Sequence, residues 1–248
     1  MDNVEFVYKS TASKEAILWE SHCHPYFEII AVIEGTVELS SEGKHFSLSS
    51  DTVTLIPPLR YHTVTASGKG VYRRVTVLFD AQVLPAPLKK ELATVCTDIS
   101  TFSSPLSREA GRVWEGEYYA PLRCALLTQI LYTAIEHARN RTAQNEIDRT
   151  LRDILRYIDE HLEEPIPLAE VAAATARSTS SLCHIFRKKM NISVKQYILE
   201  KKLALAAKYI RDGVPPTIAA SQIGYVNYSN FYRMYRRRFG TPPSQKEK

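Results

Sequence analysis

The sequence predicts an α+β protein of two domains, with a β-rich N-terminal domain followed by helices and an all-α C-terminal domain. Three observations predict this division. The 248 residues exceed the usual size of one domain. Segments rich in β-branched residues occur between residues 27 and 80, whereas helical patterns dominate after residue 149. Residues 171–248 hold 15 Lys and Arg against 3 Asp and Glu, whereas residues 1–144 hold 14 against 16.

The N-terminal domain should be a barrel or a sandwich. FEIIAVIEGTVELSS is rich in β-branched residues and is interrupted at Glu34-Gly35, which predicts a hairpin. KHFSLSSDTVTLIPP and GVYRRVTVLFD predict further short strands. Many short strands separated by turns are typical of such folds.

A group of polar residues accompanies these strands. Alternate residues of a strand share a face, so His22, His24 and Glu28 should project together. Imidazoles and a carboxylate can hold a divalent transition metal, or can hydrogen-bond a small effector, or can be structural, and all three readings stay open. Tyr26 could line the barrel mouth, where an aromatic face suits a sugar or another small organic effector.

This pattern resembles that of the cupins. His22 and His24, three residues, Glu28, six residues and Gly35 reproduce the spacing of the first cupin motif, and Pro57 to His62 fits the second. The resemblance implies a double-stranded β-barrel. We expect an effector site formed by His22, His24, Tyr26, Glu28 and His62. The alternative is a metal held by His22, His24, Glu28 and His62.

A helical connection should follow the barrel. QVLPAPLKKELATVC contains a short helix, SSPLSREAGRVWEGEYYA is irregular with a helical turn, and PLRCALLTQILYTAIEHARN is a strong helix with Pro121 in its first turn. The apolar arc of this helix is wide, so we hypothesise packing between two protomers, beside packing on the barrel alone. The expected domains are a sensor barrel at 1–84, a helical connection at 85–138, a polar linker at 139–148 and a DNA-binding domain at 149–248.

Residues 215–244 have the pattern of a helix-turn-helix. After a short first helix and a turn, the second helix should begin at Asn227 as N-cap and stop at Gly240 in the left-handed conformation. Phe231 and Tyr235 are four residues apart and should pack inward.

A second copy of this pattern lies upstream, in residues 168–190. A short Ala-rich helix and a turn lead to Ser178, the N-cap of a helix that ends in a basic cluster. VKQYILEKKLALAAKYIRDG joins the copies as a continuous helix. Its ~17 helical residues span roughly 26 Å. A rod of this length can set two recognition helices about one DNA turn apart, near 34 Å.

The exposed faces of the two second helices carry polar and basic side chains. Such a face can lie in a DNA major groove, with Arg233 reading guanine and the arginine run contacting phosphate. A solvated amphipathic helix is the alternative. We expect DNA contacts from Ser178, Thr179, Ser180, Cys183, His184, Arg187, Asn227, Tyr228, Ser229, Tyr232, Arg233, Arg236 and Arg237.

Residues 151–244 resemble the DNA-binding domain of the AraC/XylS family of bacterial transcription regulators. IGYVNYSNFYRMYRRRFGTPPS is similar to the family signature, and the first motif matches the family pattern at Ala172, Ala176, Ser178, Leu182, Phe186 and Arg187. The resemblance implies a seven-helix unit with two helix-turn-helix motifs. It also implies that Ser180, Cys183 and His184 approach bases.

Several residues depart from the family pattern. Pro216 and Ala219 replace aliphatic residues in the first helix of the second motif. Asn191 and Ala176 stand where Gly is usual, and Lys202 stands where the linker helix usually has Arg. Because Asn tolerates the left-handed backbone conformation, the local turn at Asn191 should survive the change.

The resemblance implies a sequence-specific transcription regulator rather than an enzyme. It would bind double-stranded promoter DNA under the control of a small-molecule effector, as a homodimer, with RNA polymerase as a further partner if it is an activator. The alternative is a metal-dependent cupin enzyme or metal sensor fused to a DNA-binding domain. No cofactor is expected besides the effector, although a divalent metal stays open.

The sequence gives no support to several other classes of protein. No apolar run approaches the ~20 residues of a membrane span, and MDNVEFVYKS lacks the order of a signal peptide, so we expect a cytoplasmic protein. The four cysteines lack CxxC spacing, which argues against a zinc finger or a disulfide framework. The sequence has no P-loop, no Gly-rich dinucleotide turn and no nucleophile elbow.

Overall fold

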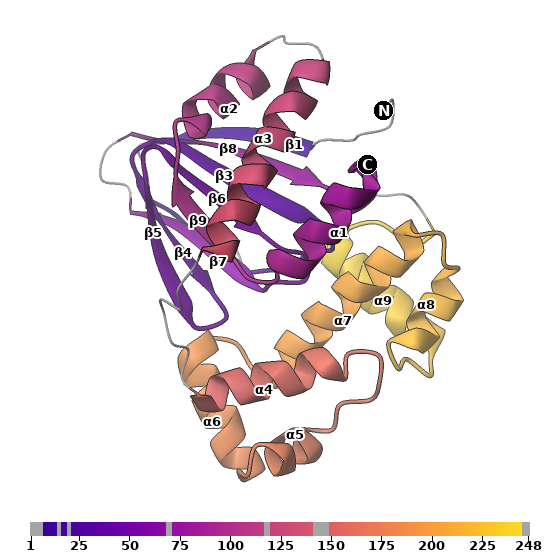
Figure 1. The fold of residues 1–248 in the computed structure, drawn as a ribbon. Helices are drawn as coiled ribbons and strands as arrows, with labels where there is room; N and C mark the ends of the chain where they lie inside the picture. The colour runs from indigo at the N-terminus through magenta and orange to yellow at the C-terminus, as the bar shows by residue number, and fades with distance from the viewer. Residues whose placement is uncertain are drawn as a thin grey trace. The chain divides into compact units, whose positions relative to one another are not determined.

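The computed structural model describes residues 7–13, 16–18, 21–67, 71–116, 120–140 and 149–244. The chain divides into two compact units, a mixed α+β unit and an α-helical unit (Figure 1). The described residues after residue 148 belong to the α-helical unit, and the short segment His22–Pro25 is grouped with it. The predicted α+β class with two domains is confirmed.

Two antiparallel sheets form the N-terminal unit. The first has the strand order β1 (Val7–Ser13), β8 (Tyr72–Phe79), β3 (Phe27–Glu34), β6 (Thr52–Ile56) and β9 (Ser100–Ser103). The second has the order β2 (Ala16–Leu18), β7 (His62–Ser67), β4 (Thr36–Ser41) and β5 (Lys44–Ser49). Strands form in all three predicted segments, and β1, β2, β7 and β9 were not predicted. The expectation that His22 and His24 lie on one strand with Glu28 is wrong, because both histidines precede β3.

The connection between β3 and β4 differs from the prediction. The sequence predicts a hairpin at Glu34-Gly35, but the two strands belong to different sheets, so the chain crosses between the sheets there. Gly35 has a φ of +82°, and a Cβ on it would lie 2.4 Å from the carbonyl oxygen of Val71. Gly is therefore needed for a close approach of two backbones and not for a hairpin turn.

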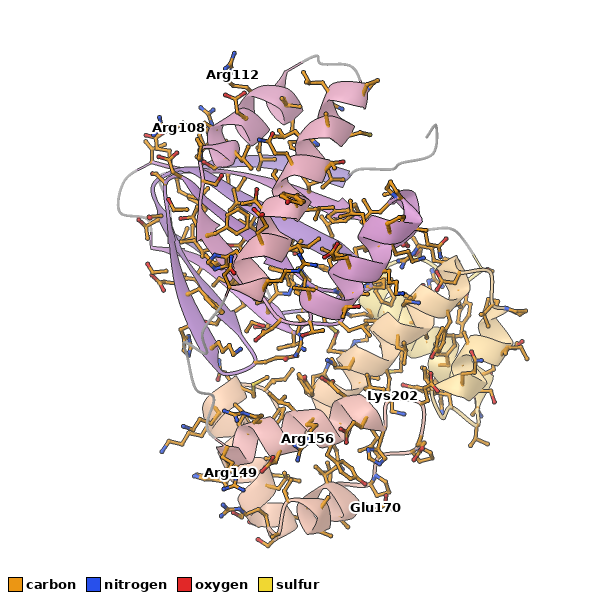
Figure 2. The ribbon with its side chains drawn as sticks, in the orientation of Figure 1. Arg108, Arg112, Arg149, Arg156, Glu170 and Lys202 are labelled. Carbon is orange, nitrogen blue, oxygen red and sulfur yellow. The ribbon has the colours of Figure 1, made fainter. Side chains whose placement is uncertain are left out.

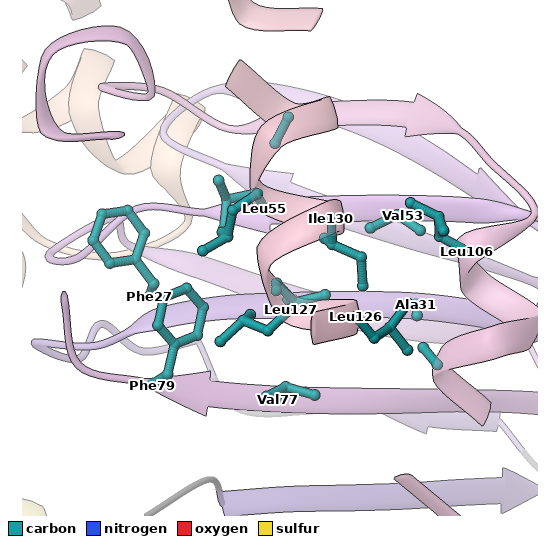
Figure 3. Packing of buried hydrophobic residues seen from close by; sticks show 14 of the residues in the cluster. Phe27, Ala31, Val53, Leu55, Val77, Phe79, Leu106, Leu126, Leu127 and Ile130 are labelled. Carbon is teal, nitrogen blue, oxygen red and sulfur yellow. The ribbon is translucent and has the colours of Figure 1, made fainter. Parts of the chain in front are cut away.

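Successive residues of the strands face two different cores. On β3, Ile30 and Val32 face the core between the two sheets, whereas Ile29 and Ala31 face the helices that cover the first sheet. Figure 3 shows this second core, where side chains of β3, β6 and β8 meet Leu126 and Ile130 of α3 (Ala120–Arg139). Strand β3 is thus buried on both faces.

The segment after β8 packs on this sheet instead of forming a loose connection. It contains the 3-10 helix η1 (Ala81–Val83), α1 (Ala86–Val95), β9, α2 (Leu106–Glu115) and α3. Most of the apolar arc of α3 is buried within the unit, whereas Tyr132 is exposed; the buried residues are Leu126, Leu127, Ile130, Leu131, Ala134 and Ile135. The wide apolar arc is therefore covered inside one chain, and it gives no support to packing between protomers.

Six helices occur in the described part of the C-terminal unit, one fewer than the resemblance implies. They are α4 (Arg149–Glu160), α5 (Leu168–Ala174), α6 (Thr179–Met190), α7 (Val194–Arg211), α8 (Pro216–Gln222) and α9 (Tyr228–Phe239). In Figure 1 the pair α5–α6 lies at one end of α7 and the pair α8–α9 at the other. The predicted continuous helix between the two motifs is confirmed as α7.

Most of the predicted linker lies outside the described residues, which stop at Asn140 and resume at Arg149. Helix α3 itself continues to Arg139. Among the described helices, none is both long enough and apolar enough to cross a membrane.

Candidate functional site

Helix α9 begins and ends where the sequence predicts. The side chain of Asn227 accepts a hydrogen bond from the backbone N–H of Asn230 at 3.1 Å, and Gly240 ends the helix with a φ of +75°. Phe231 and Tyr235 are buried, with ring centroids 5.5 Å apart. One face of α9 is therefore fixed to the unit and the opposite face is directed to solvent.

Helix α6 repeats this construction. Ser178 accepts a hydrogen bond from the backbone N–H of Ser181 at 3.2 Å, and Asn191 ends the helix with a φ of +54°. The left-handed conformation expected for Asn191 is thus confirmed. Phe186 is fully buried and packs edge-on against Tyr197 of α7, with centroids 5.2 Å apart.

The predicted DNA-contact residues lie on the solvent sides of these two helices and at their N-caps. Two of them, Cys183 and Tyr232, are half-buried. The others are exposed, and they are Ser178, Thr179, Ser180, His184, Arg187, Asn227, Tyr228, Ser229, Arg233, Arg236 and Arg237. The structure therefore leaves most of the predicted face accessible to a ligand.

The arginines of α9 differ in their surroundings. Arg233 donates a hydrogen bond to the side-chain oxygen of Asn230, one turn earlier, which holds its guanidinium along the helix. Arg238 is half-buried and donates to the carboxylate of Glu200 on α7. Arg236 and Arg237 are exposed. In this basic run, Arg238 therefore stabilises the unit, whereas Arg236 and Arg237 are exposed and can contact DNA phosphates.

Val226 is a candidate that the sequence reasoning missed. It directly precedes the N-cap Asn227 and its side chain is fully exposed. In helix-turn-helix proteins the N-terminal end of the second helix contacts base edges, and a branched apolar side chain can contact the methyl group of thymine. An apolar residue in a polar turn was the signal that could have found it.

Lys202 fixes the turn of the second motif. It projects from α7 (Figure 2), and its Nζ donates to the carbonyl oxygens of Glu164 at 2.5 Å and Ile223 at 2.7 Å. Burial lowers the pKa of Lys202, while the charge of Glu164 opposes that shift. Because Ile223 is the C-cap residue of α8, this lysine connects the linker helix directly to the helix-turn-helix.

In the N-terminal unit, Glu28 and His62 form a buried pair between the sheets. Nε2 of His62 lies 3.0 Å from Oε2 of Glu28, and its Nδ1 lies 2.8 Å from the carbonyl oxygen of Arg60. Burial lowers the pKa of His62, but the hydrogen bond and charge of Glu28, with the Arg60 carbonyl, outweigh burial and the positive charge of Arg74, so the pKa is raised.

The remaining predicted residues of this site lie just before β3. His24 is buried, and His22 and Tyr26 are half-buried. One ligand atom from each of His22, His24, Glu28 and His62 lies within 4.8 Å of the others. Three imidazoles and a carboxylate are a donor set that suits zinc, iron or manganese. The spacing of these four residues in the sequence had predicted that they form one site.

Both halves of the chain match known families. Residues 8–113 match the model of an AraC-like ligand binding domain, and residues 171–248 match that of a helix-turn-helix domain.

Individual relatives are also transcription regulators. The chain is 32% identical over 97 residues to the regulatory protein SoxS of Escherichia coli K12, a match that covers 39% of this chain and 91% of SoxS. It is 25% identical over 248 residues to the probable transcriptional regulator LumQ of Photobacterium leiognathi, with 90% of each chain covered. A solved structure of ToxT from Vibrio cholerae matches with a TM-score of 0.46 and 10% identity, over 96% of each chain.

Proposed function

The chain belongs to the AraC family of transcription regulators, and from this premise we propose that its two helix-turn-helix motifs bind one promoter site while the interior of the N-terminal unit binds an effector. As a member of this family, the chain has a ligand-binding domain and a helix-turn-helix DNA-binding domain.

One observation carries the proposal for DNA. Helices α6 and α9 share a polar N-cap, a buried aromatic face, an exposed face ending in basic residues and a left-handed stop. Helix α7 holds them on one unit, and its 18 residues correspond to about 27 Å. Two recognition helices on such a rod can enter successive turns of one major groove.

The two helices contribute differently to sequence reading. On α6, Ser180, Cys183 and His184 offer short polar groups to base edges, and Arg187 contacts phosphate. On α9, Arg233 reads guanine and Val226 contacts a thymine methyl group. Specificity is therefore concentrated in the second motif. The remaining predicted residues of α6 and α9 contact the sugar-phosphate backbone of the DNA. Among them, Arg236 and Arg237 supply the positive charge.

Replacing Arg233 with Ala is expected to weaken binding to the preferred site by about 1–3 kcal/mol and to relax the preference at one base pair. The reason is the loss of a bidentate contact to guanine. Selection of binding sites from a random DNA pool, with wild type and variant in parallel, measures both effects. Arg237→Ala is the matched control, because an exposed phosphate contact should weaken all sequences about equally. Equal loss on all sequences for Arg233→Ala would reassign it to phosphate.

The effector acts on DNA binding through its affinity for different arrangements of the protein. A ligand shifts an equilibrium only as far as it binds one state better than another. We propose an effector of about the size of a sugar, held between the sheets near Glu28 and His62. Binding as a homodimer, and recruitment of RNA polymerase if the protein activates, complete the proposed function.

Metal binding is a second candidate function of this region. The observation that favours it is the proximity of donor atoms from His22, His24, Glu28 and His62. The chain would then be a metal sensor or a metal-dependent enzyme. Metal analysis of the purified full-length protein tests this candidate. About one zinc, iron or manganese per chain, lost in the His62→Ala variant, would support it, and metal-free wild-type protein that binds its DNA site would exclude it.

A further inference from the structure

The loop that leads into the first motif (α5–α6) contacts the turn of the second motif (α8–α9). The loop is residues 161–167, between α4 and α5, and the turn is residues 223–227. Gly224 of this turn has a φ of +80°, and a Cβ on it would lie 3.3 Å from the backbone nitrogen of Pro165 and 3.4 Å from the carbonyl carbon of Glu164. The backbones of the two segments are therefore in close contact at a position that favours glycine.

Lys202 joins these two segments to the middle of α7 (Figure 2). Its Nζ donates to the carbonyl oxygen of Glu164 in the loop and to that of Ile223 in the turn. The side chain is buried, with 7% of its surface exposed. Hydrogen bonds from a charged donor are stronger than those between neutral groups, and a buried carbonyl that loses its donor is destabilised. One side chain thus connects α7, the first motif and the second motif.

The two motifs are attached to α7 in different ways. In the first motif, Phe186 packs edge-on against Tyr197 of α7. In the second, the buried ring of Phe231 contacts Tyr225 and Tyr235, which belong to the same motif. The buried residues of α8 are two alanines, which offer little apolar surface for a contact. Polar contacts therefore contribute more to the attachment of the second motif than to that of the first.

We propose that Lys202 determines which distance between two DNA half-sites the protein accepts, because it holds the second motif in one orientation relative to the first. This inference rests on the proposed binding of both motifs to one DNA site. One base pair added between two half-sites moves them apart by about 3.4 Å and rotates one relative to the other by about 35°. A second motif that Lys202 fixes at its turn resists this displacement, whereas a second motif without this contact can follow it.

The end of α9 has its own connection to α7. Arg238 donates to the carboxylate of Glu200, two residues before Lys202 on α7. This ion pair does not involve Lys202, so it keeps α9 attached when Lys202 is replaced. We therefore expect the Lys202→Met variant to fold and to bind DNA with a second motif whose orientation is less restricted.

The test measures DNA affinity as a function of half-site spacing. The probe is the DNA site selected by the full-length wild-type protein, with one or two base pairs inserted or removed between its half-sites. Each affinity is divided by the affinity of the same variant for the unaltered site, so a uniform loss of binding cancels. We expect one inserted base pair to weaken wild-type binding by about tenfold or more, and to weaken Lys202→Met binding by about threefold or less.

Lys201→Met is the matched control, because it makes the same substitution at the adjacent buried lysine. Nζ of Lys201 lies 2.8 Å from Oδ1 of Asp159 on α4. This ion pair connects α7 to α4 and does not involve the second motif. Its loss should lower the free energy of unfolding, but the dependence of DNA affinity on half-site spacing should stay as steep as in the wild type.

Gly224→Ala is a second test variant, which keeps Lys202 in place. A methyl group at this position would displace the turn from Pro165, and the positive φ disfavours alanine there. The variant should therefore also bind sites of altered spacing with a smaller relative loss than the wild type. If Lys202→Met does not fold, Gly224→Ala decides: a reduced dependence on spacing supports the proposal, and an unchanged one overturns it.

Two other outcomes would overturn the role of Lys202. One is a spacing dependence in folded Lys202→Met as steep as in the wild type, and the other is a Lys201→Met variant that loses the dependence to the same extent. Failure of the proposed function itself has a different result, because the wild-type protein would then select no site with two half-sites. A wild type that selects such a site, with unchanged spacing dependence in the variants, rejects the role of Lys202 alone.

Discussion

Replacing Phe231 with Ala is expected to lower the free energy of unfolding of the C-terminal unit by about 3–5 kcal/mol. Phe231 is fully buried and contacts Tyr225 and Tyr235, with ring centroids 5.7 Å and 5.5 Å away. A helix of 12 residues such as α9 depends on such packing for its stability. Sequence-specific DNA binding should therefore be lost as well. Urea denaturation and a binding titration measure the two effects.

The matched control for this prediction is again Arg237→Ala. Its side chain is exposed on the same helix, so its removal should change the free energy of unfolding by less than about 0.5 kcal/mol. DNA affinity should still fall, with a salt dependence reduced by about one unit of slope. A Phe231→Ala variant with normal stability and normal DNA binding would contradict the account of how α9 is held.

Replacing Glu28 with Ala is expected to destabilise the N-terminal unit by about 3–5 kcal/mol, because it leaves a charged group buried without its partner. His62 is 1% exposed and Glu28 is 6% exposed. The folded-state pKa of His62 is raised, so the stabilisation by this pair is fully present below pH 6.5 and is lost as the pH rises through the raised value. Urea denaturation at pH 6 is therefore the appropriate measurement.

The double variant with Leu at both Glu28 and His62 provides the control for that change. It removes both partners, which together carry no net charge, and it fills the space with apolar side chains. We expect the double variant to be more stable than Glu28→Ala. A double variant as unstable as the single one would show that the loss comes from packing and not from the charge left behind.

Local signals predicted the C-terminal unit well. The N-caps Ser178 and Asn227, the left-handed stops Asn191 and Gly240, and the continuous helix α7 are all present. Each of these features is set by residues within a few positions in the chain, so the sequence contains the information directly. Their roles in DNA binding stay predictions until a complex is measured.

Long-range packing explains the errors in the N-terminal unit. The pairing of β4 with β5 and β7, and not with β3, depends on contacts that no local pattern encodes. Residues 106–115 form a helix despite an internal glycine, because Gly111 lets α2 approach the sheet: a Cβ there would lie 2.6 Å from Cδ1 of Ile33. Close packing thus outweighed the weak local helix signal.

The candidate interior site was predicted only in part. The spacing of His22, His24, Glu28 and His62 identified the polar group. The strand alternation assumed for it does not hold, since His22 and His24 precede β3. The burial of Arg74 was not predicted, since nothing local in GVYRRVTVLFD distinguishes a buried arginine from an exposed one. Only the position of β8 inside the first sheet shows that one of its two arginines is buried.

The most direct test of the central claim is selection of genomic DNA fragments by the full-length protein at near-physiological salt. We expect a shared motif with two half-sites about one helical turn apart, one for each recognition helix. The genes beside the selected sites would then be the regulated ones. Binding that is abolished by moderate salt and shows no sequence preference would contradict the claim, because it would reflect the positive charge of the C-terminal unit alone.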